Sequence, residues 1–262
     1  MRQTETDIVL ASENIHLNFG SIKALTAVNI QVEKGKILSI IGPNGAGKTC
    51  LINCVTGYYK PQKGNITFNG RNIVGLSPNQ IARLGISRTF QNPTLYPNMT
   101  TLDIMLAARY MHSRASILEA MVYFGRSRRE ELENRCIIEE IIRFLHIEDI
   151  RKRPVFTMSY GQRKQVEIAR AMSMQPDIIL LDEPMSGLDE VMKEIVSDLI
   201  LSMHKKGTTI ILIEHDMQAV MELSHTIMVI NYGQKIAEGT PDEIYQNPLV
   251  VKAYIGGADQ PT

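Results

Sequence analysis

The sequence predicts an α/β protein in which one core of strands and helices is interrupted by a helical insert. Residues 36–41 form a short apolar, β-branched run that leads through a glycine-rich loop into a helical pattern at 50–56. Two more apolar runs, at 178–181 and 208–213, have the composition of buried strands. Residues 101–153 separate these two parts of the chain and have helical periodicity with few strand signals.

The residues before the glycine-rich loop predict β-structure. Short β-branched or alternating runs occur at 8–10, 15–19 and 28–32, and each is typical of a strand. A further run at 65–68 is followed by the dipeptide at 69–70, Asn-Gly, which favours a tight hairpin turn. We therefore expect a β-rich segment around the first core strand.

Composition limits the classes of function. The 262 residues are 44% apolar and 21% charged, which is ordinary for a globular protein. Lys plus Arg equals Asp plus Glu at 28 each, and zero net charge disfavours a dedicated nucleic-acid surface. No apolar run approaches the ~18–20 residues that span a bilayer, and the polar first residues lack a signal peptide's apolar stretch, so we expect a cytoplasmic protein. The three cysteines fit neither a disulfide framework nor a zinc site.

Residues 42–49 read Gly-Pro-Asn-Gly-Ala-Gly-Lys-Thr, the G-x-x-x-x-G-K-[ST] pattern of a phosphate-binding P-loop. Glycines allow close backbone approach, so that successive N–H groups and the following helix N-terminus attract an anion. Lys48 supplies a cation for the β- and γ-phosphates, and Thr49 supplies a hydroxyl for Mg²⁺. A glycine-rich turn with an accidental Lys-Thr pair would not explain the position of the lysine. The predicted nucleotide-binding residues of this loop are Gly42, Asn44, Gly45, Ala46, Gly47, Lys48, Thr49 and Cys50.

Two adjacent acids follow the apolar run at 178–181. In P-loop ATPases an acid at such a strand end holds Mg²⁺, usually through water, and this predicts that role for Asp182. Glu183 lies one residue further, where a carboxylate polarises the water that attacks the γ-phosphate. Adjacent acids at a strand end are also common as solvated capping groups, but the P-loop upstream favours the functional interpretation.

His215 follows the apolar run at 208–213. A lone histidine is more often structural than functional. Ligands of open α/β sheets, however, bind at the carboxyl ends of the strands. Since His215 follows the next predicted strand of the same sheet, we predict that it contacts the γ-phosphate.

Several further motifs resemble those of ATP-binding-cassette (ABC) ATPases, and the resemblance covers nearly the whole chain. Residues 158–162, Met-Ser-Tyr-Gly-Gln, are similar to the family's signature sequence and lie at the expected spacing before Asp182. Phe90-Gln91 stands where the family has its Q-loop, 186–189 resembles the D-loop, and His215 the H-loop. The resemblance implies a P-loop NTPase (RecA-like) core with an N-terminal antiparallel β subdomain and an inserted α-helical subdomain.

The resemblance also implies roles for individual residues. Phe19 would stack on adenine, the alternative being an aromatic core residue. Gln91 would contact Mg²⁺ and the attacking water and relay to a membrane partner. Ser159 and Gly161 would bind the γ-phosphate of ATP held by a second subunit. The implied catalytic residues are Glu183, His215 and Gln91, the metal-binding residues Thr49, Gln91 and Asp182, and the further nucleotide-binding residues Phe19, Ser159, Gly161, Gln162 and Asp189.

A closer likeness is to the ATPase subunits of branched-chain amino acid importers. It rests on residues 53–61, Arg-Thr-Phe-Gln at 88–91, the Ser-Tyr-Gly-Gln signature, the segment 109–135 and the ending at 247–256. Urea-type and lipid-type transport ATPases share these patterns, so both remain alternatives. A soluble nucleic-acid-associated ABC ATPase is disfavoured by neutral charge and by the short interval between Gln91 and Ser159.

This likeness implies an ATPase that couples hydrolysis of MgATP to transport of branched-chain or other amino acids. The implied partners are two transmembrane permease subunits, a second identical or related ATP-binding subunit and, indirectly, a periplasmic or extracellular solute-binding protein, with no nucleic acid. Such a protein sits at the cytoplasmic face of the cell membrane. Residues 1–262 would be one nucleotide-binding domain, with the helical insert at about 93–160 and a helical tail at about 240–262.

Three residues depart from the general family pattern. Cys50 stands where Thr or Ser usually follows the Lys-Thr pair, and a thiol is a weaker donor than a hydroxyl. In the signature, Met158 and Tyr160 replace Leu and Gly, and Tyr160 fits the amino-acid-importer branch. The loop at 92–97 is expected to contact the transmembrane partner through Leu95 and Tyr96. The alternative is a surface loop with a buried tyrosine.

Overall fold

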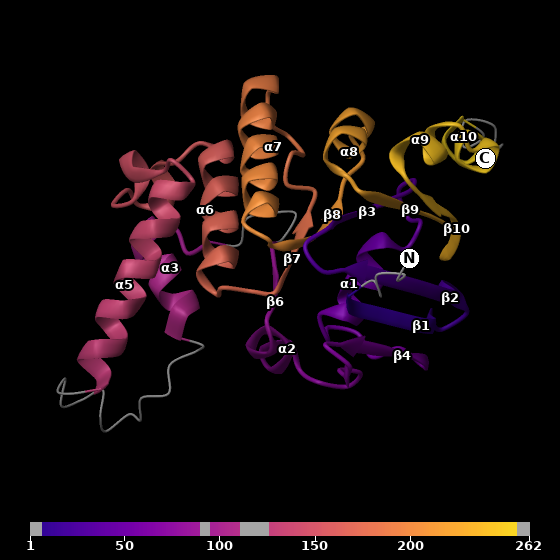
Figure 1. Ribbon diagram of the computed structural model, residues 1–262, viewed down its shortest axis with the longest axis horizontal. Coiled ribbons are helices and arrows are strands. Elements are labelled where there is room, and N and C mark those ends of the chain that lie inside the picture. Colours follow the sequence, from indigo (N-terminus) through magenta and orange to yellow (C-terminus); the bar gives the residue numbers. More distant parts are fainter. Residues whose placement is uncertain (1–6, 90–94, 111–125, 256–262) are drawn as a thin grey trace, which may run out of the picture.

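Two β-sheets form the centre of the protein, and a group of helices extends from the larger sheet (Figure 1). The computed structural model describes residues 7–89, 95–110 and 126–255. In these residues the larger sheet has six strands in the order β10-β9-β3-β8-β7-β6, and the smaller sheet has four in the order β2-β1-β4-β5. The α/β fold predicted from the sequence is confirmed.

The larger sheet is parallel except for the β9–β10 hairpin. Its strands are β3 (Ile37–Ile41), β6 (Ile86–Arg88), β7 (Ile178–Asp182), β8 (Thr209–Ile213), β9 (Thr226–Asn231) and β10 (Gln234–Gly239). Every residue of β3, β7 and β8 is buried. Strands that are covered on both faces are mostly apolar, and this is why the sequence has nearly continuous apolar runs at these places rather than alternation.

The central strands end level with one another. Ile40 of β3 and Asp182 of β7 are both register partners of Ile213 in β8, which lies between them. The segments that follow these three strands therefore begin at one edge of the sheet, which is where open α/β sheets bind ligands.

The smaller sheet is antiparallel and consists of β1 (Ile8–Phe19), β2 (Ile22–Glu33), β4 (Lys63–Phe68) and β5 (Arg71–Asn72). The two runs expected as separate strands at 8–10 and 15–19 are one strand. A register shift between Ser12 and Ile15, with Asn14 at φ 52°, marks a bulge that interrupts the alternation there. Asn69 and Gly70 turn between β4 and β5 with φ of 47° and 74°, as the dipeptide predicted.

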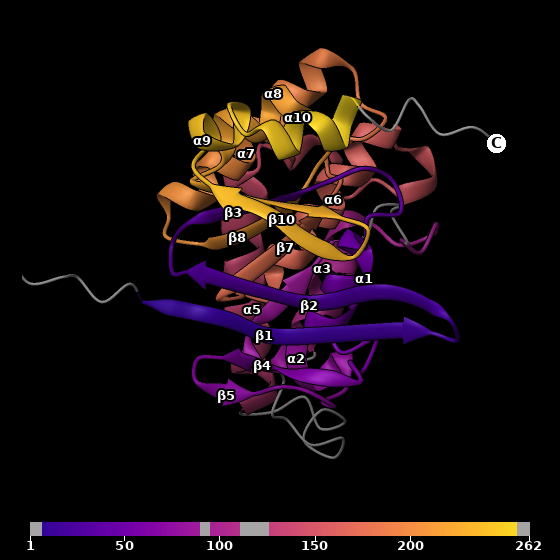
Figure 2. The ribbon, with the colours of Figure 1, turned by 90° about the vertical axis from the view of Figure 1, so that its right-hand side faces the viewer.

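Helices cover both faces of the larger sheet. They are α1 (Lys48–Val55), α2 (Pro78–Leu84), α3 (Thr101–Tyr110), α5 (Arg126–Phe144), α6 (Tyr160–Ser173), α7 (Glu190–Lys205), α8 (Met217–Leu223), α9 (Pro241–Tyr245) and α10 (Pro248–Ile255), with 3₁₀ turns at Glu148–Ile150 and Val155–Thr157. In Figure 2 the larger sheet lies between the smaller sheet and helices α8, α9 and α10.

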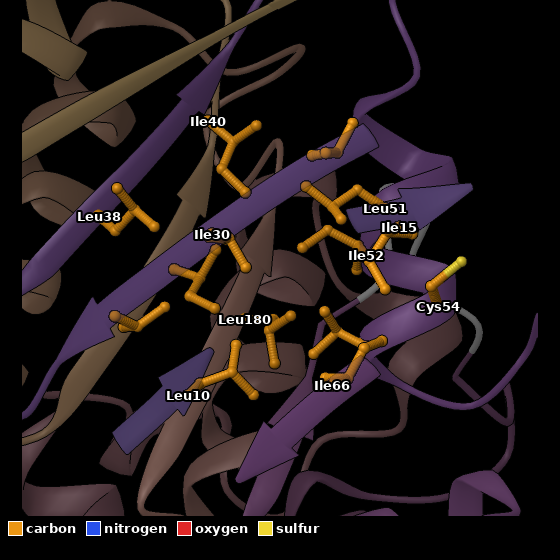
Figure 3. Packing of buried hydrophobic residues seen from close by; sticks show 14 of the residues in the cluster. Leu10, Ile15, Ile30, Leu38, Ile40, Leu51, Ile52, Cys54, Ile66 and Leu180 are labelled. Carbon is orange, nitrogen blue, oxygen red and sulfur yellow. The ribbon is translucent and has the colours of Figure 1, made fainter. Parts of the chain in front are cut away.

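Successive residues of one core strand belong to different hydrophobic cores. Leu180 of β7 packs toward the smaller sheet, in a cluster with Ile30 and Ile66 (Figure 3). The next residue, Leu181, packs against α7 at Val196 and Ile200. The larger sheet is therefore packed on both faces, which fixes the positions of the strand ends at its edge.

Helices α3, α5 and α6 enclose a further core that includes Met105, Ile142 and Val166. The opposite side of α6 joins the sheet's core through Ile168 and Ala171, so that α6 connects the helical group to the sheet. Among the described helices we find none that combines the length and the apolar character needed to cross a bilayer.

Shortening Ile30 to Ala is expected to lower the free energy of unfolding by about 2–5 kcal/mol, because its fully buried side chain would leave a cavity between the two sheets. Equilibrium urea denaturation measures this loss. The matched control is Ile22→Ala, where the side chain is 67% exposed and the change should stay within about 0.5 kcal/mol. Equal losses in the two variants would contradict this description of the core.

Candidate functional site

The P-loop connects the end of β3 to the start of α1. Gly42 and Gly47 have φ of 153° and 106°, and neither position has room for a side chain. A Cβ on Gly47 would lie 2.8 Å from the Ala24 carbonyl oxygen, and one on Gly42 would overlap the Ile230 carbonyl. The Gly233 N–H donates to the Ala46 carbonyl at 2.8 Å and holds the loop from the other side. The glycines of the motif are therefore required by the packing around the loop as well as by its turn.

Lys48 lies folded over the loop, with 7% of its surface exposed. Its Nζ donates to the carbonyl oxygens of Gly42 at 2.6 Å and Pro43 at 3.2 Å. Burial lowers the pKa of the Lys48 ammonium, and the nearby Glu183 and Asp182 carboxylates partly oppose this shift. A cation is thus held beside the N-terminus of α1, where the first backbone N–H groups of a helix also attract anions.

A cavity of about 590 Å³ adjoins this loop. Its lining combines Phe19 of β1, the loop and helix residues 44–50, Glu183, and the β9–β10 turn at Tyr232 and Gly233. Phe19 is 45% exposed, and its ring meets that of Tyr59 edge to face, with 5.2 Å between the ring centroids. Phe19 is therefore an exposed aromatic residue at the cavity wall, and the alternative of a core residue is wrong.

Asp182 ends β7 and is 5% exposed. Its Oδ2 accepts a hydrogen bond from Arg88 Nη2 at 2.7 Å, and Nη1 of the same arginine donates to Asn53 Oδ1 at 2.6 Å. The ion pair joins β7 to β6, and the hydrogen bond to Asn53 joins β6 to α1. Sequence reasoning missed the Arg88–Asp182 pair, because Arg88 ends the three-residue strand β6 and so short a run does not indicate a buried partner.

Glu183 has an unusual backbone conformation for a residue with a side chain. Its φ is +48°, in the left-handed region. Its N–H donates to the Ile213 carbonyl at 2.9 Å, and its own carbonyl accepts from Lys164 Nζ at 2.9 Å. Backbone strain of this kind persists only where surrounding contacts maintain it, and it is common at functional sites.

His215 follows β8, and 57% of its side chain is exposed. Its N–H donates to Glu214 Oε2 at 3.2 Å. It lines a second cavity of about 340 Å³ with residues 185–188 and Lys193. His215 and Glu183 thus follow neighbouring strands at one edge of the sheet, but they line different cavities.

The signature residues stand at a helix start away from the P-loop cavity. Ser159 is the N-cap of α6, with its Oγ accepting from Gln162 N at 3.2 Å and its N–H donating to Gln162 Oε1 at 3.1 Å. Gly161 is buried beside Met192, whose N–H donates to the N-cap Asp189 of α7 at 2.9 Å. None of Ser159, Gly161, Gln162 and Asp189 lines the P-loop cavity.

Three predictions concern residues around these sites. Phe90 and Gln91 lie outside the described residues. Tyr96 is 74% exposed, so the alternative of a buried tyrosine is wrong, whereas Leu95 packs on the core of the helical group. The three cysteines are free, and burial raises the pKa of Cys50 and raises that of Cys54 to about 12. Cys50 therefore stays a neutral thiol at the edge of the cavity.

Comparison with known proteins decides the family. The ABC transporter profile matches residues 25–186, more than half of the chain, and a profile described as branched-chain amino acid ATP-binding cassette transporter matches residues 234–260. The chain belongs to the ABC transporter ATP-binding family. It is therefore an ABC ATPase, as the resemblance of its motifs implied, and it hydrolyses ATP.

Relatives of this ABC ATPase align with it almost from end to end. It is 40% identical over 255 residues to BraF of Pseudomonas aeruginosa, a high-affinity branched-chain amino acid transport ATP-binding protein, with 95% of this chain and 98% of that protein covered. It is 38% identical over 254 residues to LivG of Escherichia coli strain K12, which is described in the same words and covered to the same extent.

Solved ABC cassettes have the same fold. The crystal structure of an ATP-binding cassette of an ABC transporter in its ADP conformation superposes with a TM-score of 0.83 at 35% identity, covering 96% of this chain and 100% of that one. A nucleotide-free cassette superposes with a TM-score of 0.82 at 35% identity, covering 95% and 99%. The P-loop NTPase fold is thereby confirmed, and the ABC ATPase binds an adenine nucleotide as such cassettes do.

Gly47→Ala is expected to weaken binding of ATP to this ABC ATPase roughly tenfold or more, because the added Cβ would push the loop away from the Ala24 carbonyl. Titration with a fluorescent ATP analogue measures the affinity. Gly45→Ala is the matched control, since φ is also positive there (+79°) but a Cβ would meet nothing within 4 Å. A smaller loss at Gly47 than at Gly45 would refute the role given to packing around the loop.

Proposed function

We propose that this ABC ATPase drives an importer of branched-chain amino acids. The observation that carries the proposal is the match of residues 234–260 to the branched-chain amino acid transporter profile. The described part of this segment forms β10, α9 and α10. This segment lies outside the region shared by ABC transporters in general. The names of BraF and LivG, which align over nearly the whole chain, support the same cargo.

The proposed assembly contains two transmembrane permease subunits, a second ATP-binding subunit that is identical or related, and indirectly an extracytoplasmic solute-binding protein. The ATPase would be held at the cytoplasmic face of the cell membrane by the permeases. Residues 1–262 would act as one nucleotide-binding domain with a helical insert at about 93–160 and a helical tail from about 240. No part of this assembly requires nucleic acid.

Nucleotide binding would begin at the P-loop cavity. Phe19 offers its exposed face to adenine at one end, and the glycine-rich backbone offers N–H groups to the phosphates at the other. Lys48 would exchange the carbonyls of Gly42 and Pro43 for phosphate oxygens. The Cys50 thiol, a weak donor, would add little to this binding.

The oxygen ligands near the loop fit Mg²⁺. The described residues contain no cluster of three or more His, Cys, Asp or Glu side chains that would hold a metal by themselves. A Thr49 hydroxyl and an Asp182 carboxylate suit a cation that takes its remaining ligands from phosphates and water. When bound, Mg²⁺ would neutralise charge on the phosphates. Gln91 is proposed as a further ligand.

Hydrolysis would depend on positioning and charge. Glu183 would orient or deprotonate the attacking water, and His215 would stabilise the γ-phosphate. Ser159 and Gly161 would act on the nucleotide of the second subunit, which is supported by their absence from the lining of this chain's own cavity. Closure of two subunits over ATP and their separation after hydrolysis would then move the permeases.

Glu183→Gln is expected to retain ATP binding and to lower kcat about 10²–10³-fold, since the carboxylate that activates water would be lost. Lys48→Ala should instead lose nucleotide affinity. ATP binding by calorimetry and phosphate release separate the two effects. The matched control is the exposed Glu222→Gln, for which both quantities should equal those of the parent. Parental turnover in Glu183→Gln would refute its assignment.

Cargo is tested by purifying the ATPase with its associated membrane proteins and measuring ATP hydrolysis in liposomes with the candidate cargo and solute-binding protein. Leucine, isoleucine and valine are expected to stimulate hydrolysis and to be taken up. Stimulation by urea or by lipid alone would overturn the assignment of cargo, and the assignment of the protein as an ABC ATPase would stand.

A further inference from the structure

A buried lysine connects the signature helix to the segment that carries Glu183. Lys164 lies in α6, one turn after Gly161, and is 2% exposed. Lysine is almost never buried to this extent without a partner. Its Nζ donates to the Glu183 carbonyl oxygen at 2.9 Å. Burial lowers the pKa of Lys164, and four carboxylates, those of Glu167, Glu214, Glu183 and Asp182, partly oppose this shift.

The carbonyl that receives this hydrogen bond belongs to a residue in the left-handed region. Glu183 has a φ of +48°, a conformation that side chains other than Gly, Asn and Asp rarely adopt. Its N–H is held by the Ile213 carbonyl at 2.9 Å, and its carbonyl is also within 3.3 Å of the Ser186 N–H. Among these bonds to the Glu183 backbone, the one from Lys164 has a charged donor and is therefore stronger than a bond between neutral groups.

A second buried charge holds the next residues of the same segment. Glu214 is 1% exposed, and its Oε1 accepts from Met185 N at 2.8 Å while Oε2 accepts from His215 N at 3.2 Å. Burial raises the pKa of Glu214, and these backbone bonds oppose the shift. Residues 183–185 are thus held by Lys164 from α6 on one side and by Glu214 from the end of β8 on the other.

We propose that Lys164 is a positioning residue for ATP hydrolysis, which fixes the left-handed backbone of Glu183 and so sets the direction of its carboxylate. The inference rests on the proposed role of Glu183 as the residue that activates water. Ser159 is the N-cap of α6, the helix that carries Lys164. The same lysine therefore connects the helix start proposed to act on the second subunit's nucleotide to the carboxylate proposed to act on this chain's own nucleotide.

A structural role makes a different prediction. If Lys164 only neutralised Glu167 and Glu214, its replacement would lower stability and leave turnover of the folded protein unchanged. If it positions Glu183, kcat falls while nucleotide affinity is kept, because no contact to the nucleotide is removed. A donor at this position, even a neutral one, should then restore part of the rate.

The test compares Lys164→Met, Lys164→Gln and Lys164→Arg, with kcat, KM for ATP and ATP affinity measured well below each variant's Tm. Lys164→Met is expected to lower kcat about 10–100-fold and to keep ATP affinity within about threefold. Lys164→Arg, which keeps the charge and the donor, should recover most of the rate, and Lys164→Gln part of it. The matched control is Lys206→Met, an exposed lysine stacked on Phe144 at 3.5 Å and remote from Glu183.

The Glu183→Gln background separates this inference from the proposed function. If Glu183 is the catalytic carboxylate, adding Lys164→Met to Glu183→Gln should lower kcat no further, since both changes act through the same carboxylate. Parental turnover in Glu183→Gln would refute the catalytic role itself. Parental kcat in Lys164→Met, or a loss that Lys164→Arg fails to restore, would overturn the positioning role.

If Lys164→Met does not fold, Lys164→Met/Glu214→Gln removes one charge of each sign and keeps one amide oxygen at position 214, which can still accept one of the two backbone bonds. Glu214→Gln alone is the reference for this double variant. A kcat at least tenfold below that reference supports the proposal, and a kcat equal to it overturns it.

Discussion

Parallel pairing of β3, β8 and β7 is the constraint on which the rest of this structure depends. Each strand is buried along its whole length, so a slip in register would move a strand end and with it the segment that follows. The P-loop lies more than a hundred residues before Glu183 and His215 in the chain, yet the three segments begin at one edge because these three strands end level. Hydrophobic packing on both faces of the sheet thus fixes the strand register that brings the site together.

Charge buried behind this edge is balanced within the protein. Lys48 donates to two backbone carbonyls, and Asp182 pairs with Arg88. Lys164 donates to the Glu183 carbonyl and lies near several carboxylates. Each group would be costly to bury alone, and each pairing links different elements of the fold. The charged side chains in this region therefore hold loops in place as well as offering groups to a ligand. Replacing one of them would also disturb the segments that its contacts connect.

The residues assigned to the chemistry of the site lie at separate places in this chain. The larger cavity is lined by Phe19, the P-loop and Glu183, while His215 lines a second cavity and Ser159 is the N-cap of α6. Ser159 and Asp189 both serve as N-caps here, each satisfying a backbone N–H of its own helix. Contacts with a second subunit would therefore be made by side chains that already have a hydrogen-bond partner in their own helix.

The sequence by itself determined the fold class, the family and the sheet-edge residues, because each leaves a local pattern: apolar runs for strands buried on both faces, and fixed spacings of glycine, lysine and acids for phosphate chemistry. It did not reveal that β1 runs unbroken through a bulge, nor the partners of Arg88, Lys164 and Glu214. Those pairings join residues that are between about 20 and 95 positions apart, and only the folded chain decides which buried charges meet. The left-handed backbone of Glu183 is likewise a product of tertiary contacts, since a glutamate has no local preference for that conformation.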